Sequence, residues 1–228
     1  MKWRGAAIGG GATSGKLGPA VASRNKGGQY LRSRVVPSGG TPTPQQEVIR
    51  NAIRSVVPSW SSLTPDQRAG WNTYGVNVPT VDVLGDTIQL SGQNWYVGSN
   101  VLATQIGEPL ATDAPTTFDR GGIDLSAATF TAGASMGTLS LGASLSSLMA
   151  DGGAGTLNVF CGRDYSAGRS KYFGSFQYSN TWASTSTASN LVFTLPFAHD
   201  SNNQMAINVV IRRDDGRYTT PSRLTVSP

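Results

Sequence analysis

The first acidic residue of the chain is Glu47, and seven lysines and arginines precede it. Glycine, serine and alanine dominate this stretch, and large apolar side chains are scarce; its cations are Lys2, Arg4, Lys16, Arg24, Lys26, Arg32 and Arg34. Such a segment buries too little apolar surface to build a core, so it becomes ordered only by lying on something else. We therefore expect residues 1–42 to form an extended basic arm attached to a compact body.

The charge of the chain is unevenly distributed. The net charge is +5, yet residues 1–54 hold nine Lys/Arg and one acid, whereas residues 55–228 hold nine Lys/Arg and twelve acids. A basic arm favours an anionic partner, which is nucleic acid, a membrane surface or an acidic protein groove. The candidate partner-binding residues are Arg24, Lys26, Tyr30, Arg32 and Arg34. Residues 29–36 alternate loosely, which favours their addition as a strand to a neighbour's sheet edge.

Single cysteine and histidine residues limit the chemistry. Cys161 alone excludes an internal disulfide and a cysteine-based zinc site, and we interpret it as a small apolar residue in a strand. His199 alone excludes multi-histidine metal sites. No run approaches the ~18 apolar residues of a membrane span. Gly9 to Gly11 and Lys16 interrupt any signal-peptide core, so we expect cytoplasmic synthesis without export.

Three helices and a hairpin are expected in residues 43–115. Thr43 and Thr64 each precede a proline and stand three residues before a glutamine, which predicts capping boxes for helices over 43–57 and 64–74. Pro58 is expected to end the first helix, and Trp60, Leu63, Trp71 and Tyr74 to pack the two together as a helical hairpin. Gly85-Asp86 predicts a turn between residues 81–84 and 87–90, and a third helix follows over 93–106.

From residue 116 onward, short β-prone runs alternate with turn residues. The expected strands are 123–131, 137–145, 156–161, 171–178, 190–197, 204–213 and 217–226. Seven strands in about 110 residues are typical of an immunoglobulin-like or fibronectin-like β-sandwich. Pro221 makes the last strand an edge or bulged strand. The predicted fold class is mainly β with a small α segment, in which an arm and a helical region precede the sandwich at 116–228.

Three local motifs mimic active sites. Gly10 to Lys16 has phosphate-loop spacing, but Leu17 replaces the magnesium-binding hydroxyl and Gly18-Pro19 blocks the helix that must follow. His199-Asp200-Ser201 are adjacent, whereas a catalytic triad converges from separate elements, so a turn explains them better. Asp214-Asp215 before Gly216 likewise indicates a turn. We expect no enzyme, no cofactor and no metal site.

A set of short sequence runs is distributed over about residues 15–115; the runs are Gly15–Gly18, Ser23–Pro37, Leu63–Asn72, Asn77–Pro79, Leu84-Gly85, Ser91–Tyr96 and Asp113–Pro115. In these runs the arm and helices resemble a family of uncharacterised proteins encoded in tailed-bacteriophage genomes. The β region is similar only in general character. The resemblance implies a virion component encoded among structural genes; it does not specify which component and carries over no catalytic residues.

These observations lead to one functional expectation and two alternatives. The first is a capsid cement or decoration protein, assembled into the virion in the host cytoplasm, whose arm anchors it to the major capsid protein or other virion subunits. It would be a homo-oligomer in the particle, with no membrane contact. The alternatives are a neck, tail or fibre-attachment component and a nucleic-acid-binding virion protein.

Overall fold

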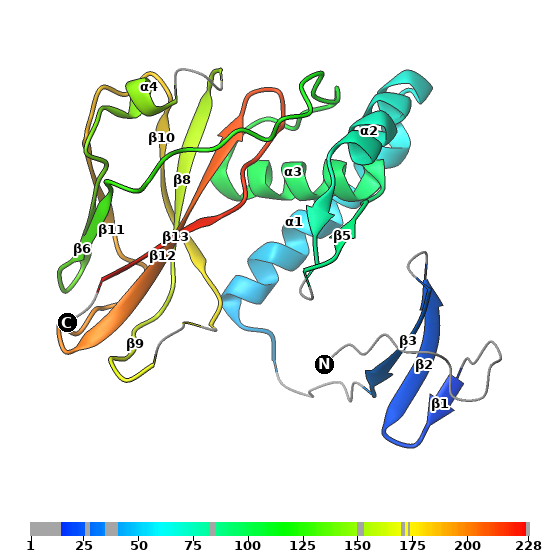
Figure 1. Cartoon of the computed structure of the whole chain (residues 1–228), viewed down its shortest axis with the longest axis horizontal. Coiled ribbons are helices and arrows are strands. Elements are labelled where there is room, and N and C mark those ends of the chain that lie inside the picture. Colours follow the sequence, from blue (N-terminus) through cyan, green and yellow to red (C-terminus); the bar gives the residue numbers. More distant parts are fainter. Residues whose placement is uncertain are drawn as a thin grey trace. The chain divides into compact units, whose positions relative to one another are not determined.

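A computed structural model describes residues 15–25, 28–34, 41–82, 85–149, 153–169, 172 and 174–226 (Figure 1). The chain divides into two compact units, Met1–Pro42 and Thr43–Pro228. The described residues are mostly antiparallel β-structure with four helices. This confirms the prediction of a mainly β chain with a small α segment.

The first unit contains a small antiparallel sheet where we expected an extended arm. Its strands are β1 (Gly15–Leu17), β2 (Ala20–Asn25) and β3 (Gly28–Ser33), in the order β1-β2-β3. Gly18, at φ +57°, begins a two-residue turn that pairs Leu17 with Ala20. Glycine favours this left-handed conformation, so the chain can fold back on itself here. The extended-arm prediction is therefore wrong for residues 15–25 and 28–33, and the rest of it, apart from residues 34 and 41–42, lies outside the described residues.

Capping boxes begin the first two helices of the second unit, as predicted. Thr43 caps α1 (Pro44–Ser62) and Thr64 caps α2 (Pro65–Asn77), each exchanging hydrogen bonds with the glutamine three residues later. The prediction that Pro58 ends α1 is wrong, because the helix continues to Ser62. Arg54 and Pro58 are both exposed, so water can bond the Arg54 carbonyl that proline leaves without a donor.

The third helix, α3 (Gly92–Ile106), holds the first two together. Trp60 and Trp71, from α1 and α2, each lie 5.5 Å from the ring of Tyr96 on α3. α1 and α2 thus meet chiefly through α3 rather than as the simple hairpin we expected. A Cβ on Gly92 would lie 2.5 Å from the α2 backbone, so glycine permits this close packing. The expected hairpin between α2 and α3 is the pair β4 (Thr80–Val81) and β5 (Thr87–Ile88).

Two antiparallel sheets complete the second unit. One has the order β11-β7-β6, formed by Asn190–Thr194, Met136–Ser140 and Thr129–Ala132. The other has the order β10-β8-β12-β13, formed by Gln177–Ala183, Gly155–Cys161, Asn203–Arg213 and Ser222–Val226. Short β9 (Tyr165–Ser166) also pairs with β12, and α4 (Leu145–Leu148) follows β7.

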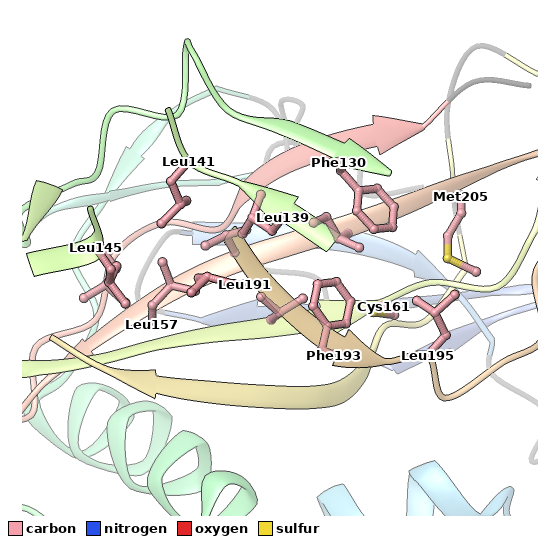
Figure 2. Close-up of a cluster of buried hydrophobic side chains, with 14 of the residues drawn as sticks. Phe130, Leu139, Leu141, Leu145, Leu157, Cys161, Leu191, Phe193, Leu195 and Met205 are labelled. Atoms are coloured by element: carbon pink, nitrogen blue, oxygen red, sulfur yellow. The ribbon is translucent and has the colours of Figure 1, made fainter. Parts of the chain in front are cut away.

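A single apolar core lies between these two sheets (Figure 2). Leu139 on β7 and Leu157 on β8, one from each sheet, are completely buried. Phe130 and Phe193 stack with their ring centroids 6.1 Å apart. Alternate residues of each strand point into this core, which is the period-2 pattern that a sheet with one buried face requires.

Several predicted strands differ in their bounds from the strands of the structure. The prediction of a strand at 171–178 is wrong, because β10 begins only at Gln177. Only the end of 123–131 is a strand, and the end of 137–145 turns into α4. Pro221 lies just before β13 rather than within it. Residues 43–115 and 116–228, separated in the sequence interpretation, belong to one compact unit.

Candidate docking surface

The N-terminal sheet collects cations on one face. Lys16 on β1 stands opposite Val21 on β2, which stands opposite Arg32 on β3. Directly opposite residues share a face, and so do alternate residues along a strand. Tyr30, Arg32 and Arg34 therefore lie together with Lys16. We call this surface the cationic face; its residues are Lys16, Val21, Ser23, Tyr30, Arg32 and Arg34.

The charges on the cationic face are exposed and have no carboxylate near them in sequence. Lys16, Arg32 and Arg34 are exposed, whereas Tyr30 is half-buried. No residue of the first unit is acidic, because the first acid of the chain is Glu47. The cations lie on either side of β2, and an anionic partner would relieve the repulsion between like charges gathered on one face.

The opposite side of the sheet carries three aliphatic residues beside the polar positions of Arg24 and Ser33. Ala20, Ala22 and Leu31 are half-buried, and Ala22 stands opposite Leu31 in the β2–β3 register. We call these three residues the aliphatic face. Because they are small or few, they can supply only a modest burial of apolar area. The sheet therefore has two chemically distinct faces and little core of its own.

The structure gathers three of the five residues predicted to bind a partner. Tyr30, Arg32 and Arg34 share the cationic face. Arg24 occupies a β2 position opposite Gln29, and this position belongs to the other face of the sheet. Lys26 lies outside the described residues. Lys16, which our prediction omitted, joins the set through β1. The Gly18-Pro19 turn was the sequence signal that could have placed it there.

The sequences that mimic active sites serve as strands and turns. Lys16 lies in β1, and not at the start of a helix as a phosphate loop requires. Ser201 and Asn202 form a turn, as expected for the histidine cluster. Asp214 and Asp215 also form a turn, and Asp215 accepts a 2.6 Å hydrogen bond from Arg217 Nε. Each motif is thus explained by local backbone structure.

His199 instead pairs with a carboxylate that sequence spacing did not suggest. Its Nδ1 lies 2.8 Å from Oδ1 of Asp164, and the His199 side chain is only 4% exposed. Asp164 also accepts a hydrogen bond from the Asp200 backbone N–H. The pair ties the loop after β8 to the loop after β11. Joining these two loops is a structural role, and it accounts for the burial of His199 beside a carboxylate.

Other polar groups of the second unit are also structural. Arg212 on β12 donates to the Glu108 carboxylate and to the Pro109 carbonyl, so it links the end of α3 to the sheet. Arg120 lies 5.1 Å from the Trp95 ring centroid and 5.0 Å from that of Tyr218, a cation–π sandwich. Cys161 on β8 is completely buried in the two-sheet core, which confirms its interpretation as a packed apolar residue, and this burial raises the pKa of its thiol to about 12.

Neither a metal-ligand cluster nor a membrane-spanning helix occurs in the described part of the chain. It contains no group of three or more His, Cys, Asp or Glu side chains placed to hold a metal ion. None of its helices combines the length and the apolar character needed to cross a bilayer. Comparison with protein-family models, with curated proteins and with solved structures finds no match.

Proposed function

We propose that the chain is a structural protein of a tailed-phage virion, a capsid cement or decoration protein that docks through its cationic face. The observation that carries the proposal is a separate compact unit with exposed cations and no acids. The resemblance of residues 15–115 to phage-encoded proteins supports the setting. An acidic groove between capsid subunits is a partner that complements such a surface in charge.

The weak interior of the N-terminal sheet also supports docking. None of its side chains for which the structure gives burial is fully buried. Three strands need a well-covered hydrophobic face for independent stability. A partner that covers this sheet would add the missing apolar burial and neutralise the cations in the same step, at some cost in ordering entropy.

We infer that the second unit forms an immunoglobulin- or fibronectin-like sandwich that the docking unit holds on the particle. If the seven main strands are lettered A, B, C, C′, E, F and G in chain order, the sheet orders become E-B-A and C′-C-F-G. This distribution of strands over two facing antiparallel sheets is the Greek-key arrangement of such domains. The apolar core shared by both sheets supports the same inference.

Co-expression with the major capsid protein of the same genome tests the docking function. The full chain should sediment with assembled particles, and a variant with Lys16, Arg32 and Arg34 changed to Glu should remain in the supernatant. The matched control changes both arginines to Lys and keeps the charge. Full occupancy of the particle's binding sites by the triple-Glu variant would contradict the proposal. Copy number per particle separates cement, at hundreds, from a neck or tail ring, at about 3 to 12 for symmetric rings.

A nucleic-acid-binding role is the second candidate, and the same acid-free cationic face favours it. Phosphate binding by a few lysines and arginines is independent of sequence and falls steeply with salt. Titration of the purified full chain with duplex DNA at several salt concentrations distinguishes the two. Submicromolar, salt-sensitive affinity that the triple-Glu variant loses would favour DNA, whereas weak binding by both chains would leave capsid docking as the function.

A further inference from the structure

The outer edge of β3 carries backbone groups that have no partner strand among the described residues. β3 ends the order β1-β2-β3, and the Arg34 N–H donates to the Pro19 carbonyl. Hydrogen-bonded and non-hydrogen-bonded pairs alternate along an antiparallel ladder. The N–H and C=O groups of Tyr30 and Arg32 therefore point toward β2, and those of Gln29, Leu31 and Ser33 point away from it.

This edge is bordered by two surfaces of opposite character. Tyr30, Arg32 and Arg34 lie on the cationic face, while Leu31 lies on the opposite face as the one aliphatic residue of β3, between the positions of Gln29 and Ser33. A strand added to β3 would place alternate side chains beside these two surfaces. Carboxylates would suit one side and aliphatic groups the other. A shift of one residue would exchange the two sets, so the pattern also fixes the register.

We propose that β3 binds an extended protein segment in which acidic and aliphatic residues alternate, added as a fourth strand of the N-terminal sheet. This inference rests on the proposed docking function and specifies the partner of the same site. The outward groups of Gln29, Leu31 and Ser33 provide main-chain affinity, and the two faces provide specificity. β3 contains no proline, so each of its outward N–H groups can donate to an added strand.

A protein strand fits this edge better than nucleic acid does. Phosphates accept hydrogen bonds, so they could pair with the arginines and with outward N–H groups. The outward C=O groups, however, need donors spaced along a chain, and a neighbouring strand supplies them at the right interval. Leu31 and Ala22 likewise gain nothing from phosphate, because they are half-buried apolar groups.

Binding of synthetic peptides to the full chain tests the proposal. One nine-residue peptide alternates Glu and Val, and a second has the same composition with its Glu and Val in separate blocks. We expect the alternating peptide to bind about tenfold more tightly, because only it satisfies both faces at once. Equal affinity of the two peptides would overturn the inference. It would also be overturned if duplex DNA bound the chain tightly and neither peptide displaced it.

N-methylation shows whether the backbone takes part. Two forms of the alternating peptide carry N-methyl groups on all Val or on all Glu residues, so charge and composition match. In a strand pairing, only one of these sets points toward β3. One form should therefore lose about a hundredfold in affinity, as for the loss of about three hydrogen bonds, and the other should bind normally. If both forms bind like the parent, the contact is not strand addition.

Substitution at Leu31 separates this inference from the docking function. Leu31→Pro removes an outward N–H that β2 does not use, and proline is tolerated at such edge positions. Leu31→Ala is the control for lost side-chain contact. Sedimentation with capsids should fall for Leu31→Pro and much less for Leu31→Ala. If both sediment normally while the triple-Glu variant does not, docking stands and strand addition fails; if all three sediment normally, docking itself fails.

Discussion

The N-terminal sheet and the two sheets of the second unit obey the same alternation but fill their faces differently. In the second unit one face of each sheet meets the other, and Leu139 and Leu157 are completely buried. In the N-terminal sheet the corresponding aliphatic face has only Ala20, Ala22 and Leu31, all half-buried. Stability is therefore concentrated in the second unit, whereas the first presents its charges and an edge, on β3, that no other described strand pairs with. Four substitutions test this division, from the largest expected effect to the smallest.

A core leucine should show the greatest loss. Leu157→Ala removes a side chain at the centre of the two-sheet core, so we expect the free energy of unfolding to fall by about 2–5 kcal/mol. Leu31→Ala in the N-terminal sheet is the matched control and should leave the main transition unchanged. Denaturant unfolding followed by tryptophan fluorescence measures both. Equal losses would contradict the division, since they would make the two units energetically one.

Arginine has opposite roles in the two units, and substitution should reveal this. The Arg212 side chain is 3% exposed and bonds Glu108, whose side chain is 21% exposed, so Arg212→Ala leaves a partly solvated carboxylate without its partner. We expect a loss of about 2 kcal/mol, between the cost of breaking a buried ion pair and that of breaking a surface pair. Arg32→Ala, on the exposed cationic face, is the control and should change stability by less than about 0.5 kcal/mol.

A double substitution checks the mechanism of the Arg212 effect. Arg212→Met combined with Glu108→Gln removes both charges and keeps much of the side-chain volume. If the loss comes from the uncompensated Glu108 charge, the double variant should be more stable than Arg212→Met alone. A double variant no more stable than Arg212→Met would show that the arginine acts through its other contacts, such as its bond to the Pro109 carbonyl.

Removal of a helix cap should have an intermediate effect. Thr64→Ala deletes the oxygen that accepts the Gln67 backbone N–H at the start of α2. Such caps are worth about 1 kcal/mol, and Thr64→Ser should restore most of it. Thermal unfolding by circular dichroism provides the measurement. Because α2 packs on α3 within the second unit, the loss should appear in the main transition rather than as local fraying.

The sequence predicted those features that depend on neighbours along the chain. Both capping boxes were predicted correctly because each lies within four residues. The end of α1 was not, because packing of Trp60 against Tyr96 on α3 extends the helix past Pro58. The pairing of His199 with Asp164 joins two distant loops, and no local pattern encodes it.

The candidate site was predicted in part for the same reason. Tyr30, Arg32 and Arg34 alternate, so their common face follows from any strand over these residues. Lys16 reaches that face only through the register of β1 with β2, which depends on the turn at Gly18. The composition of the acid-free segment predicts an extended arm, because it supplies too few apolar side chains for a core. The structure shows that short turns can still organise such a segment into a sheet.

The smallest effect should come from reversing the charge of the cationic face. Arg32→Glu with Arg34→Glu should change the unfolding free energy of the second unit by less than about 0.5 kcal/mol, because both side chains are exposed. Cys161 offers a sensitive measurement, since burial raises the pKa of its thiol to about 12 and keeps it from reagents until the core opens. Its labelling rate at pH 8 should be equal in the variant and the parent chain. Faster labelling in the variant would mean that the N-terminal sheet helps to hold the two-sheet core closed. The two units would then differ only in how much each contributes to stability, because charge on the first unit would affect the stability of the second.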